Sequence, residues 1–424
     1  MKNLALLGIF SLILLSCASK KAIVEPETVV QSKPEMSEDE LRMVKANELA
    51  HKFIITDGHV DLPYRLKVRN FRLEKEFLGI PIETDEGDFD YVRAKKGGLD
   101  APFMSIYIPA NYQVDGGAKL LADSLITMIE YITKAHPSKF QICHNVAHAH
   151  DLFEKGIIAL PMGMENGAGI EDKLENIEYF KRRGISYITL THSKDNLICD
   201  SSYDTTGTYN GLSDYGRKVV AEMNKQGVMV DISHVSDSTF YQVMEITKAP
   251  AIASHSSVRK YTPGFERNMN VDMIKRLGEN GGVIQINFGS TFLDGEIAKK
   301  RNAQRDQLME ILGEKGLSYR DDAAKPIIEK FAKDNPSLYS DVEKVADHID
   351  VVVEVAGINH VGLGSDYDGV GDSLPTGLKD VSQYPNLIAE LLKRGYSEED
   401  IEKICYKNVF RVWSQVEQIA ATLN

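Results

Sequence analysis

The chain has 424 residues, of which 43% are hydrophobic and 26% charged, a composition typical of a globular protein with a sizeable core. Its formal net charge of -13 argues against a nucleic-acid partner, because nucleic-acid-binding proteins need a basic face to neutralise phosphates. The length accommodates one large domain or two smaller ones.

Residues 1–17 are predicted to form an export signal. Lys2 gives a positive start, and residues 4–15 form an apolar run too short to span a bilayer comfortably. The run closes in Leu-Leu-Ser-Cys, which resembles a bacterial lipoprotein cleavage box and would make Cys17 the lipid-bearing first residue of the mature chain. We therefore expect the protein in the bacterial cell envelope, anchored to a membrane on its periplasmic or cell-surface side. An ordinary secretory signal is the alternative.

The next segment, residues 18–45, is predicted to be a tether that ends in a capped helix starting near Ser37. Beyond it the chain has three cysteines, Cys143, Cys199 and Cys405. Their odd number and the absence of a CxxC spacing exclude a cysteine-built zinc site and a disulfide framework. One disulfide is possible, but the sequence leaves its pairing open.

From residue 53 onward, short apolar runs alternate with helical segments, a pattern typical of βα units around a parallel sheet. There are eight such runs, so we predict an α/β fold, a (β/α)8 TIM barrel of the metallo-dependent hydrolase type, over residues 46–424. The runs are FIITD from 53, PFMSIYI from 102, IALPMGM from 158, SYITLT from 186, VMVDIS from 228, PAIAS from 250, VIQINF from 283 and VGLGS from 361.

Polar residues suited to catalysis follow most of these runs. In a (β/α)8 barrel, the residues just past the carboxyl ends of the strands line the active site. Four of the eleven histidines and three carboxylates occupy such places, which is more than an average barrel would carry by accident. They are His59, Asp61, Glu165, His192, His234, His255 and Asp366.

Five of these residues suit two metal ions. His59 and Asp61 are two positions apart, so an extended chain points both to one side. Glu165 can bridge two ions through its two oxygens, and His234 and His255 supply imidazoles that suit zinc. We expect two zinc ions per subunit, bridged by Glu165 and by a shared water or hydroxide. The alternative for Glu165 is a structural salt bridge.

The other two strand-end residues are assigned to catalysis. Asp366 could take the proton from the bridging water and pass it to the leaving amine. His192 is not needed in either ligand set, so we expect it to donate a hydrogen bond to the developing oxyanion. Ordinary hydrogen bonding at the barrel rim is the alternative for both.

Two stretches lie outside this scheme. The segment 291–345 is long, charged and helical in pattern, and is predicted to be a helical insertion beside the barrel mouth rather than a second small domain. Cys143, His144, His148 and His150 imitate a zinc cluster, but they precede the third predicted strand and so lie away from the active-site end.

The chain resembles the membrane (renal-type) dipeptidases over nearly the whole mature sequence, from about Phe53 to Val412. The matching segments are DGHVDLP, ALPMGMEN, YITLTH, DISHVS, IASHSSVR, RNMNVDMIKRLGENGGVIQINF, and VGLGSDYDGV with DVSQYPNLIAELLKRGYSEEDIEKICYKNVFRV.

This resemblance implies a barrel with two zinc ions that hydrolyses dipeptides, and in some members also the β-lactam bond of penems. It implies the same five metal ligands, proton transfer by Asp366, and contact of His192 with the substrate carbonyl. It also implies that Arg267 and Asn268 hold the substrate's terminal carboxylate, where Arg259 is a rival by charge. A homodimer is implied as well.

Three departures from the animal members border the predicted substrate cleft. Glu165 is followed by NGAG rather than by a glycine pair and histidine, Gly289 stands where a tyrosine is usual, and the long insertion follows Ser290. They leave the hydrolytic residues intact but put the side-chain preference in doubt.

Two other functions remain as alternatives. One is another barrel metallohydrolase, such as a lactonase or cyclic amidase, although such sites usually use a lysine as the bridge. The other is a lipoprotein that binds peptides without cleaving them, although a pure binder has no use for an activated water.

Overall fold

The structure is a computed structural model that describes residues 36–68 and 80–423. The predicted export signal, Cys17 and most of the tether lie outside these residues. Glu38–Asn424 forms one compact unit, which includes α1 (Glu38–Lys52) and so begins before residue 46, where the sequence placed the start of the barrel domain. Among the described residues, no helix combines the length and the apolar composition needed to cross a membrane.

The predicted (β/α)8 barrel is confirmed. Eight strands form one sheet in the order β1-β2-β5-β6-β7-β8-β9-β10, and every neighbouring pair in it is parallel. A parallel bridge between Val60 and Tyr367 brings the first strand beside the end of the last. The strands are β1 (Ile55–Val60), β2 (Leu99–Tyr107), β5 (Met162–Glu165), β6 (Ile185–Thr189), β7 (Met229–Asp231), β8 (Ile252–Ser256), β9 (Val283–Ile286) and β10 (Val361–Leu363).

The third predicted run differs from expectation because it is divided at Pro161. It forms β4 (Ile158–Leu160) outside the barrel and β5 inside it, since proline has no N–H to donate to a continuous ladder. β4 pairs in parallel with β3 (Phe140–Ile142), a short strand that the sequence pattern did not reveal.

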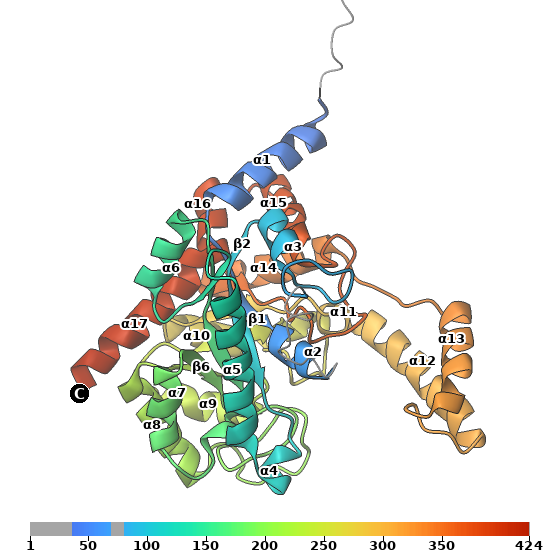
Figure 1. Ribbon diagram of the computed structural model, residues 1–424, viewed down its shortest axis with the longest axis horizontal. Helices are drawn as coiled ribbons and strands as arrows, with labels where there is room; N and C mark the ends of the chain where they lie inside the picture. The colour runs from blue at the N-terminus through green and yellow to red at the C-terminus, as the bar shows by residue number, and fades with distance from the viewer. Residues whose placement is uncertain (1–35, 69–79, 424) are drawn as a thin grey trace, which may run out of the picture. The chain divides into compact units, whose positions relative to one another are not determined.

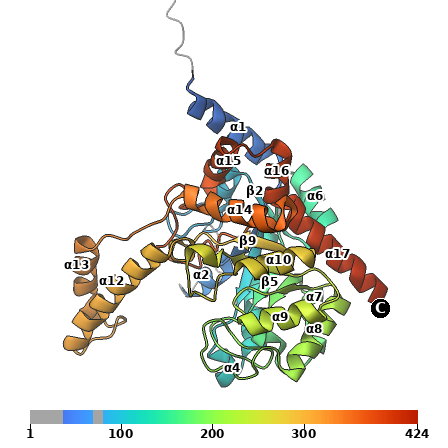
Figure 2. The same cartoon turned by 180° about the vertical axis from the view of Figure 1, so that it is seen from behind.

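Helices connect the strands and surround the barrel (Figures 1 and 2). Many begin at a polar residue whose side chain accepts a hydrogen bond from the first turn, as Ser213, Ser236 and Asn270 do. The helices are α2 (Leu62–Val68), α3 (Tyr91–Gly97), α4 (Tyr112–Asp115), α5 (Ala118–Ala135), α6 (Val146–Glu154), α7 (Glu175–Arg182), α8 (Asp214–Gln226), α9 (Asp237–Ile246), α10 (Val271–Glu279), α11 (Ser290–Leu293), α12 (Gly295–Glu314), α13 (Lys325–Asp334), α14 (Val342–Ala356), α15 (Tyr384–Lys393), α16 (Glu398–Glu402) and α17 (Asn408–Leu423).

The amino end of the barrel is filled by apolar side chains from α17. Trp413 is fully buried there, 5.4 Å between ring centroids from Phe103, which in turn lies 5.5 Å from Tyr187. The same cluster contains Ile252 and Val283, the first residues of two strands. This end is therefore a packed core, and the open end is the one where the strands finish.

The predicted insertion is a pair of helices, α12 and α13, that projects from the barrel (Figures 1 and 2). Leu308, Leu312 and Ala324 form a small apolar cluster within it. That cluster is much smaller than the core of an independent domain.

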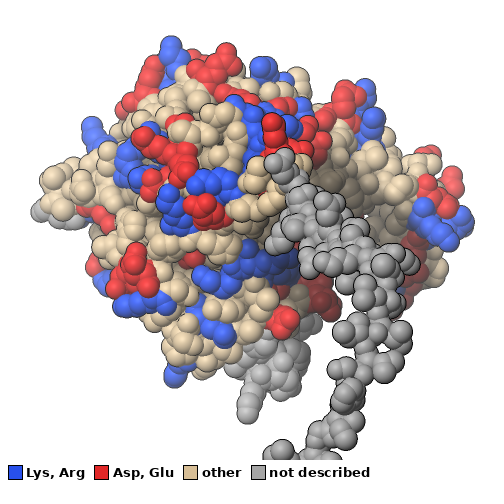
Figure 3. Space-filling view, turned by 90° about the horizontal axis from the view of Figure 1, so that it is seen from above, with Lys and Arg blue, Asp and Glu red and all other residues tan. Residues whose placement is uncertain are grey.

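The face seen in Figure 3 carries positive and negative side chains interspersed. Lys45 and Lys52 of α1, for example, both pair with Glu398 of α16, at 2.8 and 2.9 Å. The described cysteines, Cys143, Cys199 and Cys405, are buried and form no disulfide.

A buried carboxylate ties the first strand to the last one and to α15. Asp57 of β1 accepts hydrogen bonds from the backbone N–H groups of His59 (2.9 Å) and Ser365 (3.0 Å) and from the Tyr384 hydroxyl. Asp57 and Tyr384 are almost completely buried. Burial raises the pKa of Asp57, so each hydrogen-bond donor is needed to keep this carboxyl group ionised.

We predict that Tyr384→Phe lowers the free energy of unfolding by about 1.5–3 kcal/mol, because it removes a donor from a buried charged group. Urea unfolding followed by circular dichroism measures this. Tyr396→Phe is the matched control, since the Tyr396 hydroxyl donates to Asp350 (2.7 Å) at a half-buried site. An equal loss of unfolding free energy in the two variants would contradict the stabilising role of the hydrogen bonds to Asp57.

Candidate active site

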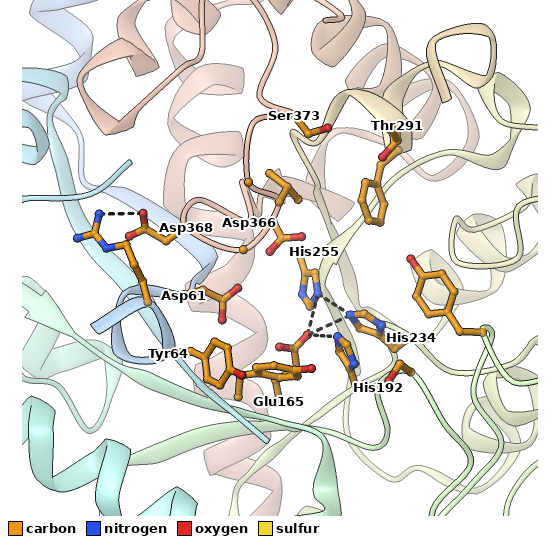
Figure 4. Close-up of a pocket in the computed structure, with 18 residues that line it drawn as sticks. Asp61, Tyr64, Glu165, His192, His234, His255, Thr291, Asp366, Asp368 and Ser373 are labelled. Carbon is orange, nitrogen blue, oxygen red and sulfur yellow. Dashed lines mark hydrogen bonds and ion pairs between the residues drawn. The ribbon is translucent and has the colours of Figure 1, made fainter. Parts of the chain in front are cut away.

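The strand-end residues meet at the open end of the barrel around a cavity of about 710 Å³. Figure 4 shows Asp61, Glu165 and Asp366 gathered with the labelled imidazoles around a common centre, while Asp368 is directed away from it. Six of the seven predicted residues line this cavity, and the seventh, His59, lies fully buried within reach of Glu165. The lining residues among the seven are Asp61, Glu165, His192, His234, His255 and Asp366.

Glu165 occupies the middle of the site. Its Oε2 lies 3.5 Å from Nε2 of His59, which is itself 3.4 Å from Oδ2 of Asp61. Its Oε1 lies 3.0 Å from Nε2 of His234 and 3.2 Å from Nε2 of His255. The two oxygens of one carboxylate therefore face two separate groups of ligand atoms, which is the arrangement needed to bridge two cations.

Two histidines have a defined tautomer. The Tyr187 hydroxyl donates to the carbonyl of Gly58 (2.9 Å), so at 2.8 Å it can only accept from Nδ1–H of His59. The Ser254 hydroxyl donates to Asp231 (2.6 Å) and in the same way accepts from Nδ1–H of His255 (2.8 Å). In the neutral form of both imidazoles, Nε2 carries the lone pair and is the nitrogen that can bind a metal ion.

The protonation of the site favours metal binding. Burial, with Arg267 and neighbouring imidazoles, holds the pKa of His234 and of His255 well below the ordinary range, so both are neutral. Burial disfavours the charged forms of both Glu165 and His59. At Glu165 the surrounding imidazoles outweigh the effect of burial and hold the pKa of the carboxyl group well below its usual value. The surrounding acidic groups, Glu165 and Asp61 among them, raise the pKa of His59 well above normal. A place that attracts a proton so strongly also attracts a cation.

The residues present fit metal ions. Ligand atoms of His59, Glu165 and His255 lie within 4.8 Å of one another, as do those of two other triplets that include His192, His234, Asp61 and Asp366. Nε2 of His59 and Oδ1 of Asp61 are buried and have no hydrogen-bond partner in the described part of the chain. Buried polar atoms without partners are costly, and a metal ion would satisfy them.

Asp366 lies at the edge of this centre. Its Oδ2 accepts a hydrogen bond of 2.8 Å from the amide of Asn287, at the end of β9. Burial, with the charges of Asp61 and Glu165 nearby, raises the pKa of Asp366 to about 7. Asp366 (φ 62°) and His234 (φ 69°) both adopt the left-handed conformation, a strain that residues other than glycine accept mainly at functional sites.

His192 faces the cavity from the opposite side to Asp61 (Figure 4). Its ring packs at a tilt against those of His234 and Tyr107, with centroid distances of 4.2 and 4.7 Å, and its Nε2 lies 3.8 Å from Oε1 of Glu165. Burial lowers its pKa, so it is neutral and can donate one hydrogen bond without adding charge.

Neither member of the predicted carboxylate-binding pair lines the active-site cavity, although Arg267 lies near it, with its guanidinium 5.5 Å from the ring centroid of the lining residue Phe292. Arg267 is buried and donates to Ser256 and to the carbonyl of His255, both at 2.7 Å, while its Nε has no partner and no carboxylate among the described residues pairs with it. Its rival Arg259 is held by Asp237. Asn268 does not line the cavity, because its amide group bonds within the loop, to Thr262 and to the carbonyl of Phe292.

Sequence reasoning missed three residues of this site. Tyr107 ends β2 and pairs in register with Glu165, and Asn287 follows β9. The strand-end rule would have found both if it had been applied to aromatic and amide residues as well as to charged ones. Tyr203 lies in the loop after β6, 5.9 Å between ring centroids from His234, and no strand-end pattern reveals it.

Comparisons with known proteins agree with this geometry. The sequence profile of the membrane dipeptidase family (peptidase family M19) matches residues 43–424. An uncharacterized dipeptidase of Schizosaccharomyces pombe is 32% identical over 408 residues, covering 91% of this chain and 86% of that protein. Dipeptidase tcpJ of Claviceps purpurea is 30% identical over 378 residues, covering 86% and 78%.

Solved structures show the same fold. The crystal structure of the probable dipeptidase PvdM from Pseudomonas aeruginosa has a TM-score of 0.74 at 24% identity and covers 89% of this chain and 99% of that one. A metallo peptidase from Rhodobacter sphaeroides, liganded with a phosphinate mimic of the dipeptide L-Ala-D-Ala, has a TM-score of 0.70 at 23% identity, covering 86% and 99%.

We predict that Ser254→Ala weakens the affinity for divalent metal by about 10- to 100-fold, because it removes the acceptor that orients His255. Competition with a chromophoric chelator at fixed pH measures the affinity. Ser105→Ala is the control, since the Ser105 hydroxyl is equally buried but has no hydrogen-bond partner among the described residues. Unchanged affinity in Ser254→Ala would contradict the orienting role.

Proposed function

The chain belongs to the membrane dipeptidase family and is a metallopeptidase, and we propose that it hydrolyses dipeptides with the aid of two zinc ions. The observation that carries this proposal is the position of Glu165, whose two oxygens face two ligand groups beside Asp366. His59 and Asp61 would hold one ion and His234 and His255 the other, with Glu165 shared. Imidazole and carboxylate ligands in this number suit zinc.

Bound zinc ions would lower the pKa of a water molecule and polarise the scissile carbonyl. The residues of the chain then have separate tasks. Asp366 takes a proton from the attacking water and transfers it to the leaving amine. Its hydrogen bond from Asn287 keeps one oxygen fixed and leaves the other free for this transfer. Neutral His192 donates a hydrogen bond to the oxygen on which negative charge develops.

The charges around the site orient the substrate. Arg267 is a buried cation with no carboxylate partner in the described chain, which suits it to attract the carboxylate of a dipeptide. Asp61 and Asp366 line the cavity and favour the ammonium group, whereas the nearby Asp368 is paired with Arg65 at 3.0 Å (Figure 4). The dipeptide mimic bound by the Rhodobacter protein supports a substrate of this size.

The same features separate this function from the two alternatives. A lactone or cyclic amide need not carry a free carboxylate to match Arg267, whereas every dipeptide carries one. A protein that only binds peptides gains nothing from a buried Asp366 whose pKa is raised beside the metal ligands.

We predict that the purified protein with zinc releases free amino acids from simple dipeptides, and that exhaustive chelation abolishes this activity. Metal analysis should find about two zinc ions per chain at full activity, because the two oxygens of Glu165 face different ligand atoms. The measurement is amino-acid release during zinc titration of the metal-free protein. Full activity after complete metal removal would contradict the proposal.

We predict that Asp366→Asn lowers kcat by about 10²- to 10⁴-fold while the zinc content is unchanged. In the unmodified enzyme the rate should rise with pH through the pKa of Asp366, because only the ionised form accepts a proton, and nearby cations should move that pKa below its metal-free value of about 7. This pH dependence should disappear in the variant. Asp372→Asn is the control, because Asp372 lies on the same loop but outside the active-site cavity. Unchanged turnover in Asp366→Asn would remove Asp366 from the mechanism.

A further inference from the structure

A second hollow opens beside the active site. It has a volume of about 750 Å³ and lies between the start of α12 and the loop at residues 262–265. Its walls combine apolar residues with polar and charged ones, among them Arg305 and Asp306. They include Tyr203, Pro263, Phe265, Ala298, Lys299 and Asn302.

This groove adjoins the active-site cavity. Tyr203 and Thr291 line both hollows, and Figure 4 shows Thr291 on the side of the cavity opposite Glu165. The active-site cavity alone is already within the range of about 300–1,000 Å³ that encloses a whole small ligand. The groove is therefore additional room connected to the reaction centre.

The insertion supplies one wall of the groove. Gly295, Ala298, Asn302 and Asp306 recur three or four residues apart, so they share one face of α12. At Gly295 the helix approaches the neighbouring loop closely, since an added Cβ would lie 3.0 Å from the carbonyl of Tyr261. The small side chain of Ala298, one turn later, leaves the groove open.

Aromatic rings lead from Arg267 to this groove. The Arg267 guanidinium lies 5.5 Å from the ring centroid of Phe292, and Phe265 meets Phe292 and Tyr203 edge-on at 5.7 and 6.0 Å. A carboxylate held by Arg267 would place the second residue of a dipeptide next to these rings. The side chain of that second residue could then extend along these rings into the groove.

We propose that this groove binds the side chain of the substrate's second residue, and that it favours a large aromatic one. Tyr203, Pro263 and Phe265 would cover the ring. Lys299 and Asn302, which also line the groove, could bond to a polar group on that ring. This inference rests on the proposed dipeptidase function and assigns its preferred substrates.

The experiment compares kcat/KM for Ala-Gly, Ala-Phe and Ala-Tyr. The unmodified enzyme should prefer the two aromatic dipeptides by about tenfold or more. Ala298→Trp fills the groove, so it should remove that preference while changing Ala-Gly hydrolysis less than about twofold. The matched control is Gln307→Trp, nine residues further along α12 and therefore about two and a half turns away, on the opposite, exposed face. This control variant should leave kcat/KM unchanged for all three dipeptides.

The inference fails if Ala298→Trp lowers the rates for all three dipeptides equally, or lowers none of them. Circular dichroism and thermal melting check that the variant folds, and Ala303→Trp on the same groove replaces it if it does not. An unmodified enzyme that cleaves no dipeptide would overturn the proposed function. An enzyme that cleaves Ala-Gly as well as Ala-Phe would overturn only the role of the groove.

Discussion

The structure depends on a concentration of buried negative charge that requires cations. Asp61, Glu165 and Asp366 are at most 8% exposed, and together they lie among the imidazoles at the open end of the barrel. Carboxylates withdrawn from water are strongly destabilising unless opposite charge compensates them. Two divalent cations would supply that compensation and at the same time the chemistry, so the stability of this end of the barrel and its catalytic function have one physical basis.

The barrel holds this charge in place through a second layer of hydrogen bonds. Tyr187 connects the apolar cluster at the amino end of the barrel to His59. Its ring packs near Phe103, and its hydroxyl is hydrogen-bonded to Nδ1 of the His59 imidazole. Asp231 acts on His255 through Ser254 in the same manner. The packed core therefore determines which nitrogen of each ligand is free, and the ligands are preorganised before any metal binds.

The sequence predicted the parts of this site that depend on strand position. In a barrel, the end of each parallel strand is directed to one rim, so a histidine or carboxylate at that position can be assigned from apolar periodicity alone. The division of one run at Pro161 and the short strand β3 could not be predicted this way, because they depend on which neighbours pair. The sequence also could not show that the Asn268 amide bonds within its own loop, because this depends on a hydrogen bond to the carbonyl of Phe292, 24 residues later.

Chemistry and selectivity are carried by different parts of the fold. The metal-binding side chains stand on or directly after buried strands, where packing restrains them, whereas Tyr203, Phe265 and Ala298 lie on a loop or on the inserted helix. A change in the inserted helix can therefore alter the shape of the groove without moving the residues around Glu165. The inserted segment after Ser290 follows this division, since its first residues, Thr291 and Phe292, line the cavity, while the five proposed ligands lie outside the insertion. An added Cβ at Gly289 would lie 2.8 Å from the Phe292 ring, so the small residue here is matched to an aromatic ring supplied by the inserted segment.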